Sequence, residues 1–203
     1  MPEITSSPVL LGLVALLAYL LGSIPFGLVI TRMMGLGDLR AIGSGNIGAT
    51  NVLRTGNKGA AAATLILDAA KGGVAVLIAR AMVGQDAAQL AALCSFLGHL
   101  FPVWLRFKGG KGVATFIGTL LALAWPVGLA TCATWAVAAL VTRISSLGAL
   151  TAAALSSLWL VVFHQGQMIV LVVILTVLVY ARHWANLERI KKGTEPRIGQ
   201  KKA

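Results

Sequence analysis

Long apolar runs dominate this chain, and a run of roughly 20 such residues is what a helix needs to cross a bilayer. The longest run, residues 112–142, carries no charge and exceeds a single span. Trp125-Pro126 near its middle predicts a break, because proline removes a backbone donor and clashes with the preceding turn. The other runs are residues 8–30, 59–83, 87–105, 145–163 and 168–182. We therefore expect an all-α integral membrane protein, a compact bundle of about seven transmembrane helices, or five or six if 112–142 is partly re-entrant.

The distribution of charge orients these runs. Only 11% of the residues are charged, 58% are hydrophobic and the mean hydropathy is +0.87, which is too apolar for a soluble domain of this size. The net charge of +11 does not indicate nucleic-acid binding, because nearly all basic residues lie at the ends of apolar runs. Under the positive-inside rule the N-terminus lies outside and the C-terminus in the cytoplasm.

This topology gathers the polar segments on one side of the membrane. The segments at about residues 31–58, 105–112, 142–146 and 182–203 all face the cytoplasm. We expect residues 1–203 to form a single polytopic membrane domain whose active-site loops are these four segments.

The first glycine-rich segment, residues 43–54, matches G-x-G-x-x-G from Gly43 to Gly48. No predicted strand precedes it and its flanks are apolar runs, so a dinucleotide-binding fold is excluded. Its glycines and its density of hydrogen-bonding side chains indicate a site for a polar ligand. The candidates are Ser44, Gly45, Asn46, Gly48, Thr50, Asn51 and Arg54.

A second glycine-rich segment, Lys108-Gly109-Gly110-Lys111-Gly112, opens the uncharged run. Backbone N–H groups and the helix dipole at such a position favour an anion, with Lys108 and Lys111 as counter-charges. The Ser or Thr that would hold magnesium after the lysine of a P-loop is missing, so the segment predicts a phosphate site without a metal-bound nucleotide.

Ionisable residues also occur inside the apolar runs. Asp68 and Lys71 are three residues apart, so they share a helix face and can pair, either as a functional site or as a buried structural ion pair. His183, Asn186 and Arg189 project toward roughly one face if the last helix continues past residue 182. That arrangement favours His183 over His99 as a site residue.

Several of these motifs occur together and in order along nearly the whole chain. They are Gly22-Ser23-Ile24-Pro25, Asp38-Leu39-Arg40, residues 43–54, Asp68-Ala69-Ala70-Lys71-Gly72, residues 98–115 and residues 182–196. The set resembles the bacterial acyl-phosphate:glycerol-3-phosphate acyltransferases, the PlsY family. The resemblance implies a multi-pass enzyme of the bacterial cytoplasmic (inner) membrane, with its active site facing the cytoplasm and with no cofactor or metal. It also implies transfer of a long-chain acyl group from acyl phosphate to the 1-hydroxyl of glycerol 3-phosphate, yielding lysophosphatidic acid and phosphate. The partners implied are those substrates, the lipid bilayer and the enzyme that supplies acyl phosphate.

The resemblance also implies roles for individual residues. The catalytic candidates are Lys111, His183, Ser146 and Asn186. The substrate-binding candidates are the two glycine-rich segments together with Lys71, His99, Thr115, Arg143, Ser145, Arg189 and Glu195. Two choices stay open: the acceptor of the hydroxyl proton is His183 or a substrate phosphate, and the site serine is Ser145 or Ser146, of which we favour Ser146.

Three other functions are weaker predictions. A transporter or channel for a phosphorylated metabolite predicts an internal repeat and a polar path across the membrane, and neither is evident. An acyltransferase of the His-x-x-x-x-Asp type is disfavoured, because His99 is followed by Trp104 and His183 by Glu188 at that spacing. A metal-dependent phosphotransferase requires clustered acids, whereas the six acids here are dispersed.

Overall fold

The computed structural model describes residues 2–199, and every regular element among them is a helix, as the sequence predicts. These residues form two compact units, residues 2–123 and residues 124–199. The predicted cytoplasmic segment 182–203 extends past them, so its last four residues, with Lys201 and Lys202, lie outside the described residues, as does Met1.

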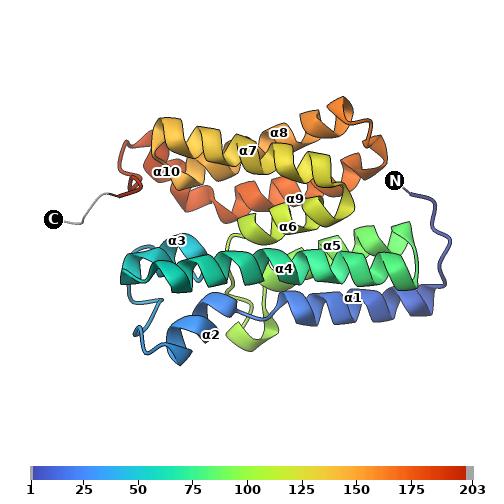
Figure 1. Cartoon of the computed structure of the whole chain (residues 1–203), viewed down its shortest axis with the longest axis horizontal. Coiled ribbons are helices and arrows are strands. Elements are labelled where there is room, and N and C mark those ends of the chain that lie inside the picture. The colour runs from blue at the N-terminus through green and yellow to red at the C-terminus, as the bar shows by residue number, and fades with distance from the viewer. Residues whose placement is uncertain (1, 200–203) are drawn as a thin grey trace. The chain divides into compact units, whose positions relative to one another are not determined.

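The N-terminal unit is built on three long helices that lie side by side (Figure 1). They are α1 (Pro8–Gly22), α4 (Lys58–Met82) and α5 (Gln85–Leu100). A shorter helix, α6 (Val113–Leu123), also packs against α4. The remaining elements are α2 (Phe26–Met33), α3 (Ala49–Val52) and the short 3₁₀ helices η1 (Leu53–Thr55) and η2 (Val103–Leu105).

The C-terminal unit pairs α7 (Trp125–Thr142) with α8 (Ser145–Val162), and α8 also contacts α9 (Ile169–Arg182) (Figure 1). The 3₁₀ helix η3 (Gly166–Met168) leads into α9. The chain then bends by 60° before α10 (Trp184–Lys191), so the last helix does not continue straight past residue 182. The prediction that His183, Asn186 and Arg189 share one helix face required a straight helix past residue 182, and the bend means that this requirement is not met.

Five helical segments among the described residues are long and apolar enough to cross a membrane, with α1 and α2 counted together as Pro8–Met33, or six if the bent pair of helices at residues 166–191 counts as one span. This number lies within the predicted range of five to seven. The count of six is one fewer than seven because α6 is too short to span the membrane. Its 11 residues rise only about 16 Å, well short of a roughly 30 Å hydrocarbon core.

The predicted break in residues 112–142 is present. The α6 helix ends at Leu123, Ala124 is extended and α7 begins at Trp125 with proline in its first turn, where the missing N–H costs nothing. The side chain of Arg80 terminates α6, because its guanidinium donates to the carbonyl oxygens of Ala122 at 2.8 Å and Leu123 at 2.9 Å.

A second break, which the sequence analysis did not predict, divides residues 8–30. The α1 helix stops at Gly22, Pro25 cannot donate a backbone hydrogen bond, and α2 starts at Phe26. The hydroxyl of Ser23 donates to the carbonyl of Tyr19 at 2.8 Å, and this bond fixes the end of α1. The carbonyl of Ile24 is left between the two helices, where a side chain can reach it.

Small residues allow α1 and α5 to approach closely. A Cβ on Gly22 would lie 2.0 Å from the carbonyl oxygen of Ser95, and one on Gly98 would lie 2.2 Å from the carbonyl oxygen of Tyr19. Such close backbone contact is typical of membrane helix pairs, in which packing replaces the hydrophobic driving force.

The Gly98→Ala variant tests this packing. Because the added methyl group would meet a rigid backbone, we expect it to lower the free energy of unfolding by about 1–3 kcal/mol, measured as a lower melting temperature in detergent micelles. Gly12→Ala is the matched control, since nothing lies within 4 Å of a Cβ at Gly12. The control should melt at or above the wild-type temperature, and equal melting of both variants would contradict the packing argument.

Candidate functional site

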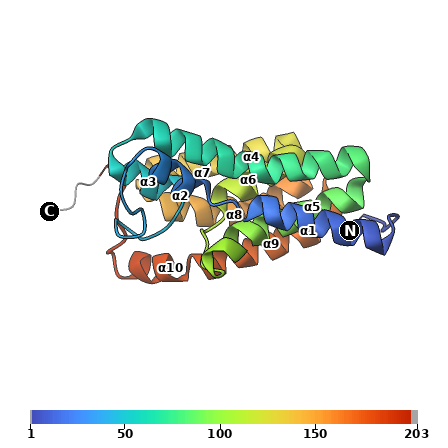
Figure 2. The same cartoon turned by 90° about the horizontal axis from the view of Figure 1, so that it is seen from below.

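The segment before α3 folds around Asn51, which is buried. The Oδ1 atom of Asn51 accepts the Ser44 N–H at 3.1 Å, and its Nδ2 donates to the carbonyls of Leu39 at 2.9 Å and Ile42 at 3.2 Å. The amide therefore binds the loop that connects α2 to α3, which lie at the same end of the N-terminal unit (Figure 2). Asn51 acts here as a scaffold of the segment and does not present its amide to a ligand.

Other candidates from this segment lie at the surface. The side chains of Ser44, Thr50 and Arg54 are exposed, and Asn46 is half-buried with its Oδ1 accepting the N–H of Ile47 at 2.9 Å. Gly45 and Gly48 are half-buried, and Gly48 immediately precedes α3. The hydroxyl of Ser44 also lies 3.5 Å from Oδ1 of Asn51. The exposed side chains of the segment are thus two hydroxyls and a guanidinium, groups of the kind that bind anions.

The Lys108–Gly112 loop leads directly into α6, as predicted. Three of its backbone amides are already bonded, because the N–H groups of Lys108, Gly109 and Gly110 donate to the carbonyls of Leu105, Leu100 and His99, each at 3.1 Å. The expectation that these amides point at an anion is therefore wrong for this conformation. The loop also carries two cations: Lys108 is exposed and Lys111 is half-buried.

The residues before this loop have unusual backbone angles. Arg106 and Phe107 have φ values of 51° and 61°, the left-handed region that side chains larger than glycine seldom adopt. The guanidinium of Arg40 donates to the carbonyl of Lys108 at 2.7 Å and adds a third cation beside the loop. Strain of this kind concentrates at functional sites, where the surrounding structure holds it.

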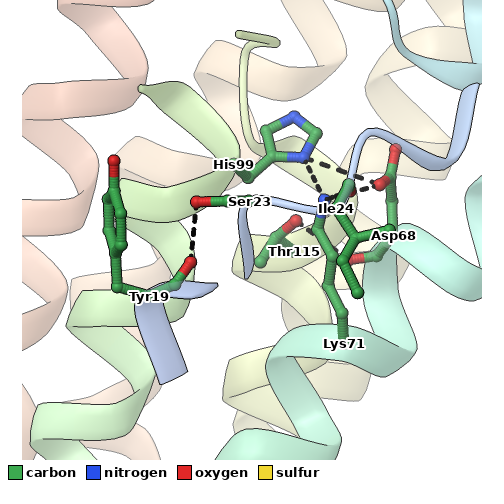
Figure 3. Close-up of polar contacts among 7 residues, drawn as sticks. All are labelled: Tyr19, Ser23, Ile24, Asp68, Lys71, His99 and Thr115. Atoms are coloured by element: carbon green, nitrogen blue, oxygen red, sulfur yellow. Dashed lines mark hydrogen bonds and ion pairs between the residues drawn. The ribbon is translucent and has the colours of Figure 1, made fainter. Parts of the chain in front are cut away.

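A buried ionic cluster lies between α4, α5 and the break after α1 (Figure 3). The Lys71 ammonium lies 2.8 Å from Oδ1 of Asp68, 2.9 Å from the carbonyl oxygen of Ile24 and 2.9 Å from Nδ1 of His99. These three acceptors use all three N–H groups of the ammonium. The predicted pairing of Asp68 with Lys71 is confirmed, and Lys71 retains no donor for a substrate.

The same cluster reaches α6. The hydroxyl of Thr115 donates to the backbone carbonyl of Asp68 at 2.9 Å, and Nδ1 of His99 lies 3.6 Å from Oδ1 of Asp68. The side chains of Asp68, Lys71 and His99 are only 1–4% exposed. Lys71 lies 13 residues after the first residue of α4, about 20 Å along the helix axis, so the cluster is deep in the unit.

In the C-terminal unit, three predicted residues donate hydrogen bonds to the carboxylate of a fourth, Glu195. Oε1 of Glu195 accepts hydrogen bonds from Oγ of Ser146 at 2.6 Å and Nδ2 of Asn186 at 2.5 Å, and Oε2 accepts one from Nε of Arg189 at 2.7 Å. Burial alone would raise the pKa of Glu195, but these three donors and the Arg189 charge hold that pKa below its ordinary value. The carboxylate also lies at the N-terminus of α8, where the helix dipole favours negative charge.

His183 is buried in the bend between α9 and α10, and its Nδ1 lies 2.8 Å from the carbonyl oxygen of Val179. A carbonyl only accepts, so Nδ1 donates this bond and Nε2 of the neutral ring is its basic nitrogen. Arg143 ends α7 with a φ of 58° and exchanges backbone and side-chain hydrogen bonds with Ile198. Ser145, the other serine candidate, is half-buried in the first turn of α8.

The structure adds contributors that the sequence analysis did not place in a site. The motifs Gly22-Ser23-Ile24-Pro25 and Asp38-Leu39-Arg40 supported the resemblance, but their spacing did not show that Ile24 would accept from Lys71 or that Arg40 would bind the Lys108 carbonyl. Within residues 2–199 no group of three or more His, Cys, Asp or Glu side chains is arranged to hold a metal ion.

The Glu195 cluster makes a prediction about pH and stability. Because the folded pKa is depressed, the ionised carboxylate stabilises the fold above the pKa of the unfolded chain, about pH 4.3, and this contribution is lost as the pH falls through the folded pKa. We expect Glu195→Gln to lower the free energy of unfolding at pH 7 by about 2 kcal/mol and to weaken its fall from about pH 5 to about pH 3, because the loss begins near the unfolded pKa and continues down to the lower folded pKa.

The control is Glu188→Gln, because Glu188 is exposed and its carboxylate accepts a hydrogen bond from Trp184 Nε1 on its own helix. Thermal unfolding in micelles across this pH range measures both variants. A Glu195→Gln protein with the melting profile of the control would show that the cluster does not stabilise the unit.

Known proteins with similar sequences and structures agree with this picture. Residues 12–193 match the family described as glycerol-3-phosphate acyltransferase. A glycerol-3-phosphate acyltransferase from Cereibacter sphaeroides is 67% identical over 99% of this chain and 96% of its own length. That of Ruegeria pomeroyi is 64% identical over the full length of both chains.

Two crystal structures of PlsY (YgiH), an integral membrane glycerol 3-phosphate acyltransferase, have the same fold. The glycerol 3-phosphate form superposes with a TM-score of 0.87 at 39% identity, covering 93% of this chain and 96% of that one. The lysophosphatidic acid form gives 0.85 at 36% identity, with 93% and 95% coverage. With both family motifs and fold in agreement along almost its whole length, the chain belongs to the glycerol-3-phosphate acyltransferase family of integral membrane enzymes.

Proposed function

We propose that this enzyme takes its acyl group from a long-chain acyl phosphate and transfers it to the 1-hydroxyl of glycerol 3-phosphate. The products are lysophosphatidic acid and inorganic phosphate. A relative of known structure has forms named for glycerol 3-phosphate and for lysophosphatidic acid, which supports this acceptor and this product. No cofactor is required in this reaction.

The observation that carries the choice of donor is the position of the Lys108–Gly112 loop. Lys108, Lys111 and the bound Arg40 guanidinium surround it with positive charge, yet the loop is bonded to the end of α5 at the depth of the buried cluster. A donor with a compact phosphate on an apolar chain suits such a place, because the loop can hold the phosphate while the chain stays in lipid. Glycerol 3-phosphate has no apolar chain, and we assign its phosphate to the exposed donors of residues 43–54.

The chemistry needs little from the protein beyond positioning and charge. An acyl phosphate is a mixed anhydride, so the acceptor oxygen can attack the carbonyl carbon directly while the bond from that carbon to the phosphate oxygen breaks. Lys111 stabilises the charge that develops on the departing phosphate. No covalent enzyme intermediate is required.

The hydroxyl proton goes to His183 in our proposal. Because Nδ1 of His183 donates to Val179, Nε2 is the ring nitrogen that can accept a proton. A phosphate oxygen of a substrate is the alternative acceptor. Ser146, Asn186 and Arg189 hold Glu195, and a direct role for them, for Arg143 or for Ser145 stays a prediction.

The membrane setting follows from the same substrates. We propose that the four polar segments face the cytoplasm of a bacterium across its inner membrane, since glycerol 3-phosphate is soluble and the acyl donor is not. Acyl phosphates are reactive anhydrides, so an enzyme that makes them must supply this donor nearby.

The donor assignment is tested with purified enzyme, glycerol 3-phosphate and either palmitoyl phosphate or palmitoyl-CoA. We expect lysophosphatidic acid and stoichiometric phosphate release with the acyl phosphate alone. Lys111→Ala should lose at least about 100-fold in kcat, as is usual when a group that stabilises transition-state charge is removed. The control Lys58→Ala removes an exposed cation at the start of α4 and should keep wild-type turnover. Turnover with palmitoyl-CoA only would refute the acyl-phosphate assignment.

The proton acceptor is tested with His183→Asn, which can still hydrogen-bond Val179 but lacks a basic nitrogen. If His183 is the base, kcat should fall about 10²- to 10⁴-fold at saturating substrates. His164→Asn is the control, because His164 is exposed and asparagine tolerates its φ of 55°. Near-normal turnover of His183→Asn would favour the substrate phosphate as the acceptor.

A further inference from the structure

We propose that Asp68, Lys71 and His99 form a positioning cluster that fixes the Lys108–Gly112 loop in the conformation that binds the donor. The inference rests on the proposed function of that loop as the acyl-phosphate site. None of the three side chains needs to touch substrate in this account. They act through the end of α5, to which the loop is bonded.

Lys71 fixes the orientation of the His99 ring. The Lys71 ammonium donates to Nδ1 of His99 at 2.9 Å, so Nδ1 is an acceptor and a neutral ring carries its proton on Nε2. A bond from Nδ1 to Asp68 is not favoured, since the separation of 3.6 Å is too long. Lys71 is itself fixed by Asp68 and by the Ile24 carbonyl, so the ring is held from two helices and the break after α1.

His99 contacts the loop through both its backbone and its ring. The backbone carbonyl of His99 accepts the Gly110 N–H at 3.1 Å, and a Cβ on Gly110 would lie only 2.2 Å from Nε2 of His99. The Gly110 backbone therefore lies directly against the ring edge, where only glycine fits. Any rotation of the ring would push on the residue next to Lys111.

The buried cluster has an energetic cost. Burying three ionisable groups in an apolar helical unit is expensive, and a buried ion pair is often no more stabilising than apolar residues of the same size. A purely structural contact between α4 and α5 would thus be served as well by leucines. Unlike leucines, the ionic cluster fixes the orientation of the His99 ring, which supports Gly110.

The test compares two nearly isosteric variants. His99→Asn places an oxygen where Nδ1 accepts from Lys71, whereas His99→Leu has the same shape without an acceptor. Thr64→Ala is the matched control: Thr64 is also buried on α4, but its hydroxyl bonds only to its own helix at Ala60 in the contacts seen here. Each variant is purified in micelles and measured for acyl-transfer kinetics and for amide hydrogen exchange by mass spectrometry.

For His99→Leu we expect kcat/KM for palmitoyl phosphate to fall about 10- to 100-fold, the usual consequence of losing a hydrogen bond to a charged group, while KM for glycerol 3-phosphate stays at the wild-type value. The Gly109 and Gly110 amides should exchange faster, with α4 and α5 still protected. His99→Asn keeps the acceptor for Lys71 but loses the Nε2 edge of the ring, so it should restore both properties only in part, and Thr64→Ala should change neither.

Wild-type kinetics and wild-type loop exchange in His99→Leu would overturn the proposal, and so would faster exchange throughout α4 and α5, which would indicate a merely structural role. If His99→Leu does not fold, Asp68→Asn/Lys71→Gln removes both charges together and carries the same expectations. Lys111→Ala separates the two proposals: an active Lys111→Ala enzyme refutes the loop's role in donor binding, whereas an inactive one beside a normal His99→Leu enzyme refutes only the positioning cluster.

Discussion

The arrangement of the N-terminal unit depends on one ammonium group with three acceptors. The ammonium of Lys71 donates to a carboxylate on its own helix, to an imidazole on α5 and to a carbonyl in the break after α1. An ammonium in an apolar interior must satisfy every N–H, so these three elements cannot separate without leaving a buried charge unpaired. The same constraint positions the glycine-rich loop before α6, because the Gly109 and Gly110 amides donate to the last two residues of α5.

The C-terminal unit uses the opposite charge in a similar way. Glu195 collects donors from α8 and α10, so a chain segment beyond the last helix is tied to the start of α8. In both units the polar groups that hold the fold are buried and paired. The cations at the two glycine-rich segments, Lys108, Lys111 and Arg54, are exposed or half-buried, which suits the substrate-binding role that we propose for them.

Much of this could be predicted from the order of residues. Apolar runs gave the long helices, Trp125-Pro126 marked the division between α6 and α7, and the spacing of Asp68 and Lys71 predicted their pairing. The break at Ser23-Ile24-Pro25 was hidden by the apolar residues on both sides, and the bend after Arg182 by a helical pattern that continues through it. The role of Asn51 was also missed, because a short segment does not show which carbonyls will surround a buried amide.

The sequence by itself determined that the chain is helical, that it spans a membrane several times and, through its ordered motifs, which family it belongs to. These properties depend on local hydrophobicity and on residue identity, which can be read along the chain. Only the tertiary structure decided which polar groups serve the fold and which stay available for chemistry. A hydrogen-bond donor has no fixed partner until distant segments meet: Lys71 donates to the carbonyl of Ile24, Asn51 to that of Leu39 and Ser146 to Glu195, each far away in sequence.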